Sequence, residues 1–123
     1  MMPDVSVRAI RGAITADEDT PDAIRAATAE LLGEMLGRNG LDPGDLISMV
    51  FTTTPDLCAE FPAVAARQIG LSQVPLLCAS EINVPGALGR CIRVMVHANV
   101  PGEVTVRHVY LRGASQLRTD LTE

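Results

Sequence analysis

Two charged residues stand within the most apolar part of this sequence. Glu81 ends an apolar run that starts at Val74, and Arg93 lies inside a second apolar run that follows the Pro85-Gly86 turn. A charged group on a core-like strand is costly unless something pairs with it. Glu81 and Arg93 together therefore indicate a functional site rather than an ordinary surface.

Four more polar side chains are candidates for the same site. Arg11 ends the apolar face of a predicted N-terminal strand, Tyr110 lies in the last predicted strand, and Arg67 and Arg118 are the remaining two. Guanidinium groups bind carboxylates in a bidentate way, and a carboxylate accepts a hydrogen bond from a hydroxyl. The set therefore predicts a site for a small ligand with two carboxylates and a hydroxyl.

Two of these arginines also have structural interpretations. A structural ion pair at Arg11 fits the pattern as well as a ligand site does. Arg67 falls near the end of a predicted helix, where a basic side chain suits the negative end of the helix dipole. On the pattern alone, that interpretation of Arg67 outweighs a functional one.

Metal and covalent chemistry find little support in the spacing of the reactive side chains. The gaps between Cys78, Cys91, His97 and His108 match no compact ligand pattern, so we expect no metal site. Nothing resembles a nucleophile elbow. The glycines at 86–89 lack the strand-loop-helix context of a phosphate-binding loop.

The overall composition argues against polyanionic partners. A net charge of -5 opposes binding to nucleic acid or to an anionic membrane, and 2% aromatic residues are too few for a base-stacking platform. No apolar run reaches membrane-spanning length. Three cysteines without a CxxC pair, and no apolar leader before Val5, predict a cytoplasmic protein.

The elements that must position these residues follow from periodicity and capping signals. At 123 residues we expect a single domain, 1–123, with one hydrophobic core. The order of elements predicts an α+β fold, a mixed β-sheet with helices packed on one face. The predicted strands cover 5–15, 46–53, 74–79, 90–98 and 104–111, and the predicted helices run from Thr20 to the Asn39-Gly40 terminator, briefly at 54–56, and over 62–68.

The same patterns predict which faces are buried. Val5 and Val7 share one face of their strand with Arg11, which predicts that this face points to the core or to a pocket. The strand at 46–53 is apolar enough for burial on both faces. The segment 112–123 has no clear periodicity and is expected to be a mobile tail.

Seven short stretches, in order over nearly the whole chain, form a family pattern. They are AIRGA at 9–13, TPDL at 54–57, FPA at 61–63, VP at 74–75 with Cys78 and Glu81, CIRVM at 91–95, RHVYL at 107–111, and LR at 117–118 followed by DL at 120–121. With this pattern the sequence resembles the small, non-helical class of chorismate mutase, which is a homotrimer.

The resemblance implies a ferredoxin-like subunit that assembles as a trimeric pseudo-barrel, with active sites in clefts between neighbouring subunits. It implies conversion of chorismate to prephenate, an intramolecular Claisen rearrangement at the branch towards phenylalanine and tyrosine. No cofactor or covalent intermediate is needed. Catalysis would come from conformer selection and electrostatic stabilisation of the transition state.

The resemblance also implies roles for individual residues. Arg93 would face the ether oxygen whose bond breaks, and Arg11 with Tyr110 would hold the enolpyruvyl carboxylate. Glu81, with the backbone around Cys78, would take the ring hydroxyl. The remaining matches are wall positions and two arginines for the ring carboxylate: Phe61, Ala63, Leu76, Leu77 and Leu117 as walls, and Arg67 and Arg118 at the mouth.

Two positions depart from the family pattern. Val64 stands where the family often has lysine, so the ring carboxylate would depend more on Arg67 and Arg118, or on water. Leu77 stands where a polar residue can occur, which should affect the pocket wall more than the chemistry.

Two rival functions use the same architecture. The first is a non-catalytic trimeric protein that binds a small dianion as a ligand or effector, and the pairing of Glu81 with Arg93 favours the enzyme over it. The second is an imine or enamine deaminase, which would need its own arginine and glutamate near the C-terminal strands. We do not find that arrangement in the sequence.

Overall fold

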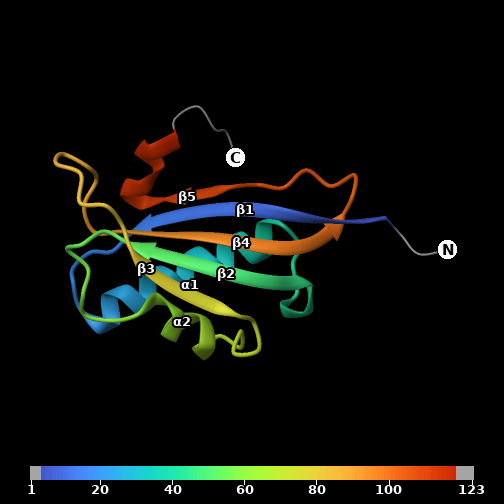
Figure 1. Ribbon diagram of the computed structural model, residues 1–123, viewed down its shortest axis with the longest axis horizontal. Coiled ribbons are helices and arrows are strands. Elements are labelled where there is room, and N and C mark those ends of the chain that lie inside the picture. The colour runs from blue at the N-terminus through green and yellow to red at the C-terminus, as the bar shows by residue number, and fades with distance from the viewer. Residues whose placement is uncertain (1–3, 119–123) are drawn as a thin grey trace.

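Five strands and two α-helices form the structure, a computed structural model that describes residues 4–118 (Figure 1). The strands at 5–15 and 46–53 and the helix at 62–68 match the predicted ranges. The strands are β1 (Val5–Thr15), β2 (Leu46–Thr53), β3 (Leu76–Ser80), β4 (Cys91–Pro101) and β5 (Val109–Leu111), the α-helices are α1 (Pro21–Arg38) and α2 (Pro62–Gln68), and the 3-10 helices are η1 (Pro43–Asp45) and η2 (Arg112–Arg118).

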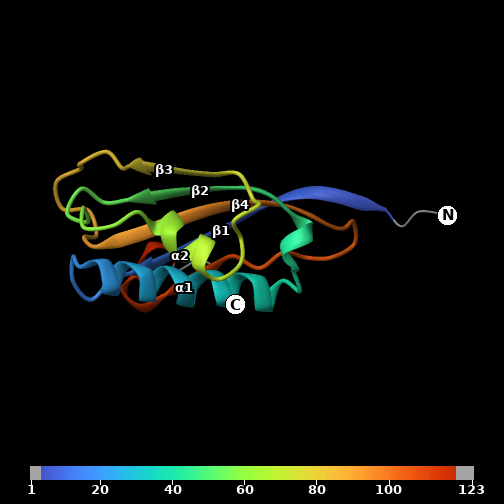
Figure 2. The ribbon, with the colours of Figure 1, turned by 90° about the horizontal axis from the view of Figure 1, so that it is seen from below.

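The strands form one mixed sheet in the order β3-β2-β4-β1-β5. The central strand β4 is antiparallel to both β1 and β2, whereas the outer strands β5 and β3 run parallel to β1 and β2. Both α-helices lie on one face of this sheet, as the view from below shows (Figure 2). The predicted α+β fold with helices on one face is confirmed.

Helix α1 begins and ends where the capping signals predict. The Thr20 hydroxyl accepts a hydrogen bond from the Ala23 backbone N–H at 3.1 Å, and Pro21 occupies the first turn. At the other end, Asn39 Nδ2 donates to the Met35 carbonyl at 2.8 Å, and Gly40 adopts a φ of 61°. These two caps give α1 the length that it needs to cover the sheet.

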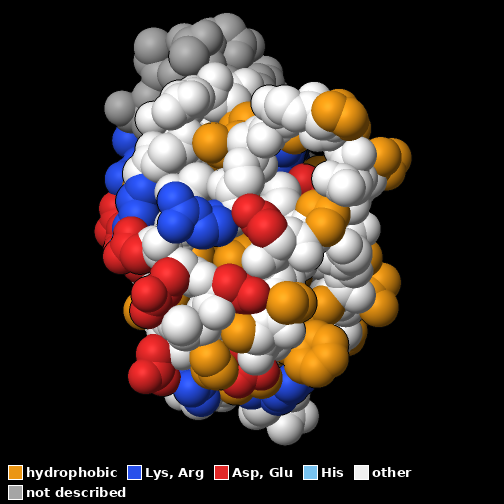
Figure 3. Space-filling model, turned by 90° about the vertical axis from the view of Figure 1, so that its left-hand side faces the viewer, with side chains coloured by type: hydrophobic (Ala, Val, Ile, Leu, Met, Phe, Trp, Pro, Cys, Tyr) orange, Lys and Arg blue, Asp and Glu red, His pale blue; other side chains and the backbone are white. Residues whose placement is uncertain are grey.

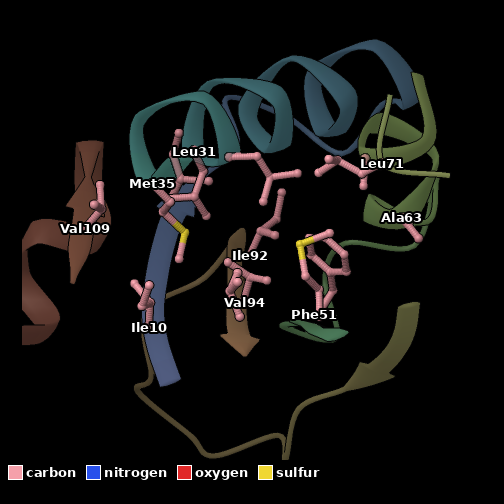
Figure 4. Packing of buried hydrophobic residues seen from close by; sticks show 14 of the residues in the cluster. Ile10, Leu31, Met35, Phe51, Ala63, Leu71, Ile92, Val94 and Val109 are labelled. Atoms are coloured by element: carbon pink, nitrogen blue, oxygen red, sulfur yellow. The ribbon is translucent and has the colours of Figure 1, made fainter. Parts of the chain in front are cut away.

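The main hydrophobic core fills the space between α1, α2 and the sheet (Figure 4). Leu31 and Met35 from α1 point towards Ile10 on β1 and Ile92 on β4, and all four side chains are fully buried. Burying one such side chain is worth about 1.5–3 kcal/mol relative to leaving it exposed. The apolar stripe of α1 therefore holds the two central strands in place.

The structure changes two predictions of buried faces. Val5 and Val7 are exposed and the main core lies on the opposite face of β1, which carries Ile10, whereas Arg11 lines a cavity on its own face, as predicted. Strand β2 buries Met49 and Phe51 on one face only. Val5, Val7 and the second face of β2 are not buried because both α-helices cover the same face of the sheet (Figure 2).

The C-terminal region also differs from the prediction. Only Val109–Leu111 forms a strand. Residues 104–108 contact β1 through isolated hydrogen bonds and not through a regular ladder; in one of them the Arg11 N–H donates to His108 Nδ1 at 3.0 Å. Residues 112–118 form η2 rather than an irregular tail, and Arg112 Nη2 bonds Glu30 on α1 at 2.6 Å. The rest of the predicted mobile tail, 119–123, lies outside the described residues.

The segment at 54–56 is a turn and not the predicted turn of helix. The Leu57 N–H donates to the Thr54 carbonyl at 3.0 Å, which closes a single turn. The Thr54 hydroxyl donates a hydrogen bond to the Asp56 carboxylate and accepts one from the Cys91 backbone N–H at 2.9 Å. These side-chain bonds compete with helical ones and tie the end of β2 to the start of β4.

Asp19, in the loop before α1, joins this loop to the segment after β2. Its carboxylate accepts hydrogen bonds from the Cys58 N–H at 2.9 Å, the Ala59 N–H at 3.0 Å and the Cys58 thiol at 3.2 Å. The bond from the thiol is the main reason that the pKa of Asp19 is lowered, and the same bond raises the pKa of Cys58. Cys58 is exposed, but its raised pKa keeps it in the protonated thiol form, which is less reactive than the thiolate.

The first prediction concerns Gly12, where α1 comes closest to β1. A Cβ atom at Gly12 would collide with Met35 Sδ and would lie 3.2 Å from Leu31 Cδ1. Gly12→Ala should therefore lower the free energy of unfolding by about 1–3 kcal/mol through overpacking, as measured by urea denaturation.

Gly33 provides the matched control for this prediction. It lies on the exposed side of α1, and an added Cβ would meet no atom within 4 Å. Gly33→Ala should raise the free energy of unfolding by about 0.5–1 kcal/mol, because glycine is unfavourable inside a helix. A Gly12→Ala protein as stable as the parent would contradict the close approach of α1.

The second prediction concerns the reactivity of Cys58. Asp19→Asn removes the carboxylate that raises the pKa of the thiol, so the thiolate fraction should rise. Peptide mapping after iodoacetamide treatment at about pH 8 should show faster labelling of Cys58 in the variant, since this pH lies near ordinary thiol pKa values.

Stability against pH gives a second readout of the same contact. The pKa of Asp19 is lower when folded, so its stabilisation is present above the unfolded pKa and is lost as the pH falls through the folded pKa. Parent and Asp19→Asn should therefore converge in stability at acid pH.

Cys91 provides the control for the labelling experiment, because it is buried and should resist labelling in both proteins. Equal labelling of Cys58 in both would show that the carboxylate does not control the thiol.

Candidate active site

Glu81 and Arg93 are in contact on the open face of the sheet. Arg93 Nε lies 3.2 Å from Glu81 Oε2, and the two side chains are 46% and 18% exposed. The same carboxylate oxygen accepts a hydrogen bond from the Thr52 hydroxyl at 2.6 Å. The two charged residues that stood out in the sequence therefore form one cluster with Thr52.

The register of three strands brings this cluster together. Thr52 on β2 is the direct cross-strand partner of Arg93 on β4. The Glu81 N–H donates to the Thr53 carbonyl at 2.8 Å, which extends the parallel pairing of β2 and β3 by one residue. Glu81 thus follows the end of β3 and reaches Thr52 and Arg93 from the edge side of the sheet.

A cavity of about 320 Å³ opens beside Arg93 on the same face. Arg11 from β1, Tyr110 from β5 and Leu117 from η2 line it together with Arg93. These four residues were candidates from the sequence, and the structure brings them together. The volume falls in the range of small-molecule sites, and two guanidinium groups with a phenol suit a carboxylated ligand.

Several residues of this cavity could not be identified as candidates from the sequence. Val50, Thr52 and Met95 line the cavity because β2 and β4 alternate their side chains between the core and the open face. The two-residue period already placed Met95 on the face of Arg93. Thr52 gave no such signal, since its neighbour Arg93 is 41 positions away in the chain and depends on the strand register.

A thiol and a histidine lie close to this cluster without entering the cavity lining. Cys91 is fully buried beside Ala13 and Ala114, and burial raises its pKa, so it stays a neutral thiol. His108 Nδ1 accepts the Arg11 N–H and helps to hold the backbone of β1 at this point. Within the described part of the chain, no group of three metal-ligating side chains gathers.

The other candidate residues form a second, separate group. Phe61 and Cys78 border a hollow of about 230 Å³ between the start of α2 and β3. Phe61 is 66% exposed at the N-terminus of α2. This hollow shares no lining residue with the cavity beside Arg93. The candidate residues therefore border two separate hollows of this chain and not one pocket.

The alternation of β3 separates three neighbouring candidates. Leu76 and Cys78 pair with Met49 and Phe51 and pack against the core, whereas Leu77 is 63% exposed on the open face. Ala63, in the first turn of α2, is also part of the core. These side chains therefore do not all point to the same side of the sheet.

Two candidate arginines remain, Arg67 and Arg118. Arg67 is exposed in the last turn of α2, where it suits the helix dipole, and it lines neither hollow. Arg118 ends η2, one residue after Leu117, which does line the cavity. The Arg67 guanidinium is therefore not placed beside Arg93, and the Arg118 side chain lies outside what the structure describes.

The end of the molecule that carries the 82–89 loop has a mixed surface. Figure 3 views this end and shows charged side chains gathered on one side and apolar ones along the other. Ile82 and Val84, in the loop after Glu81, are both exposed.

No helix among residues 4–118 is long and apolar enough to cross a membrane.

Solved structures and characterised proteins resemble this chain over most of its length. Chorismate mutase AroH of Thermus thermophilus is 55% identical over 118 residues, which cover 94% of this chain and 96% of the relative. Chorismate mutase AroH of Bacillus subtilis (strain 168) is 43% identical over 119 residues, with coverages of 94% and 93%.

The fold agrees with these sequence matches. A chorismate mutase from Clostridium thermocellum superposes with a TM-score of 0.85 at 50% identity, over 89% of this chain and 98% of that one. A family model described as chorismate mutase type I matches residues 7–121. This match includes both strands and the loop that form the Thr52, Glu81 and Arg93 cluster, and with the two relatives it shows that the chain belongs to the chorismate mutase type I family.

Proposed function

We propose that this protein is a chorismate mutase, which converts chorismate to prephenate on the route to phenylalanine and tyrosine. The observation that carries the proposal is the placement of Arg93, Arg11 and Tyr110 around one cavity, with Arg93 oriented by Glu81. Chorismate has two carboxylates, a hydroxyl and an ether oxygen, and this cluster offers a complementary group for each kind of oxygen.

The reaction redistributes bonds within a single molecule. The carbon–oxygen bond of the ether breaks while a carbon–carbon bond forms, and no proton, electron or group leaves the substrate. Negative charge grows on the ether oxygen in the transition state, and Arg93 would donate a hydrogen bond there. A preorganised donor of this kind is typically worth about 10²- to 10³-fold in rate.

The other residues of the cavity would select the reactive conformer. Arg11 and Tyr110 would hold the enolpyruvyl carboxylate from β1 and β5. Glu81 does not line the cavity but contacts Arg93 at its edge, and from there it would accept the ring hydroxyl. Leu117 and Met95 would close the walls. Fixing both ends of the substrate places the two reacting carbons together and removes much of the entropic barrier.

The second group of residues supports a site that is shared between subunits. Phe61, Leu77 and Arg67 are exposed and lie outside the cavity beside Arg93, so within one subunit they do not line the site of a ligand bound in that cavity. We propose a homotrimer in which this surface of one subunit covers the cavity of the next. Exposed apolar side chains such as Ile82 and Val84 fit such burial.

The proposed site also gives roles to the remaining candidates. Arg67, and Arg118 at the end of η2, would act on the ring carboxylate, and the backbone around Cys78 would contact the ring hydroxyl. Ala63 and Leu76 would support the pocket wall from beneath, because both side chains pack into the hydrophobic core. The three free cysteines fit the cytoplasm, where we propose that the enzyme works.

The third prediction tests the role of Arg93. Arg93→Lys keeps the charge but loses the planar guanidinium and its contact through Nε, so kcat should fall by about 10²-fold or more while the fold persists. The measurement is the loss of chorismate absorbance under saturating substrate, with circular dichroism to verify the fold.

Arg38→Lys is the matched control for this substitution. Arg38 pairs with Glu34 on the surface of α1, outside both hollows, so its replacement should leave kcat unchanged. Near-normal turnover in Arg93→Lys would exclude the proposed role of Arg93. A parent protein that binds chorismate without consuming it would favour the rival function of a non-catalytic dianion-binding protein.

The fourth prediction tests whether the site is shared between subunits. Arg93→Ala removes the cavity side, and Arg67→Glu reverses a charge on the proposed covering side. Co-expressed in equal amounts, the two inactive subunits should assemble into trimers with about a quarter of the parent activity, because one site in four receives two intact sides. Native mass spectrometry should show three copies.

Each variant expressed alone serves as the control for complementation. Both should remain trimeric and poorly active at low substrate concentration. A mixture as inactive as the separate variants, in the presence of mixed trimers, would place the whole site within one subunit. A monomeric parent protein would contradict the trimer itself.

A further inference from the structure

Thr52 has a more specific relation to the cluster than the other newly identified cavity residues. Its hydroxyl donates to Glu81 Oε2 at 2.6 Å, and that same oxygen lies 3.2 Å from Arg93 Nε. One oxygen of the carboxylate thus accepts the hydrogen bond of Thr52 and forms the ion pair with Arg93. Among the described residues, none donates a hydrogen bond to Glu81 Oε1, so this second oxygen can accept a bond from a ligand.

The backbone alone leaves the Glu81 side chain with freedom to rotate. Glu81 follows the last residue of β3, and the segment after it, 82–84, forms neither helix nor strand. Its N–H is tied to the Thr53 carbonyl, but several torsions separate that bond from the carboxylate. A side-chain contact is therefore required to fix where the carboxylate points.

Thr52 is well suited to provide this contact. It lies inside β2, directly across from Arg93 on β4, so its position relative to the guanidinium is set by the strand register. A β-branched side chain in a strand has few χ1 rotamers, which holds its hydroxyl in a defined direction. A hydrogen bond to a carboxylate is also stronger than one between neutral groups.

We propose that Thr52 is a positioning residue for the reaction, which orients Glu81 so that Oε2 keeps Arg93 in place and Oε1 faces the substrate hydroxyl. This inference rests on the proposed function for its consequence in catalysis. The contact itself is independent of that function. Packing alone does not explain threonine here, because valine has nearly the same shape and would fill the same half-buried place in the sheet.

The experiment compares Thr52→Val with Thr52→Ser, in the parent and in a Glu81→Ala background. Thr52→Val should lower kcat/KM about tenfold or more in the parent, as expected for losing a hydrogen bond to a charged group. Thr52→Ser keeps the hydroxyl and should stay within about twofold of the parent. In Glu81→Ala, the further change Thr52→Val should alter kcat/KM by less than about twofold, because its partner is already absent.

The outcomes separate positioning from a structural role. Equal losses for valine and serine, or the same loss with and without Glu81, would overturn the proposal. Thr28→Val is the control, because Thr28 donates its hydroxyl to the Ile24 carbonyl inside α1 at 2.7 Å, and its replacement should leave kcat/KM unchanged. If Thr52→Val shows no cooperative unfolding transition, Thr52→Ala provides the same comparison without a second methyl group.

A crystal structure of Thr52→Val tests the inference independently of activity. We expect the Glu81 carboxylate to turn away and its contact with Arg93 Nε to be lost. A carboxylate that keeps its position in this variant would overturn the proposal, whether or not the parent consumes chorismate. A parent without chorismate mutase activity would overturn only the proposed function and would leave this structural result to stand by itself.

Discussion

The antiparallel register between β2 and β4 is the constraint on which this site depends. It sets Thr52 opposite Arg93, and the parallel pairing of β3 on β2 then carries Glu81 to the same point. Three residues distant in sequence therefore meet within hydrogen-bond reach. A shift of one residue would turn these side chains to the core face, where the cost of burying charge would oppose folding.

One face of the sheet packs against the α-helices and forms the core, and the other face carries the candidate active-site residues. Ile92 and Val94 of β4 belong to the core under α1, while Arg93 between them stands on the open face. Because α1 and α2 supply enough apolar surface to build one core, the open face is free to carry charge. This division places the guanidinium on a rigid central strand, where packing holds its backbone in position.

The open face also bears on the proposal that the site is shared between subunits. A cavity lined by Arg11, Arg93 and Tyr110 remains open to solvent on one side, and charged groups act more strongly on a ligand when water is excluded. The exposed Phe61 and Leu77 stand elsewhere on the same subunit. In the proposed trimer these two features become one closed site, so assembly and catalysis would depend on the same surfaces.

The sequence by itself determined the elements with strong local signals and the identity of the charged residues. The limits of β1, β2 and α2, the caps of α1, and Glu81 and Arg93 as the central pair all follow from local periodicity and from the cost of isolated charge. Only the tertiary structure decided which strand faces are buried, that 104–108 pairs with β1 through isolated bonds, and that Thr52 joins the cluster. These features depend on strand register and on which face the helices cover, and both are set by contacts between residues far apart in the chain.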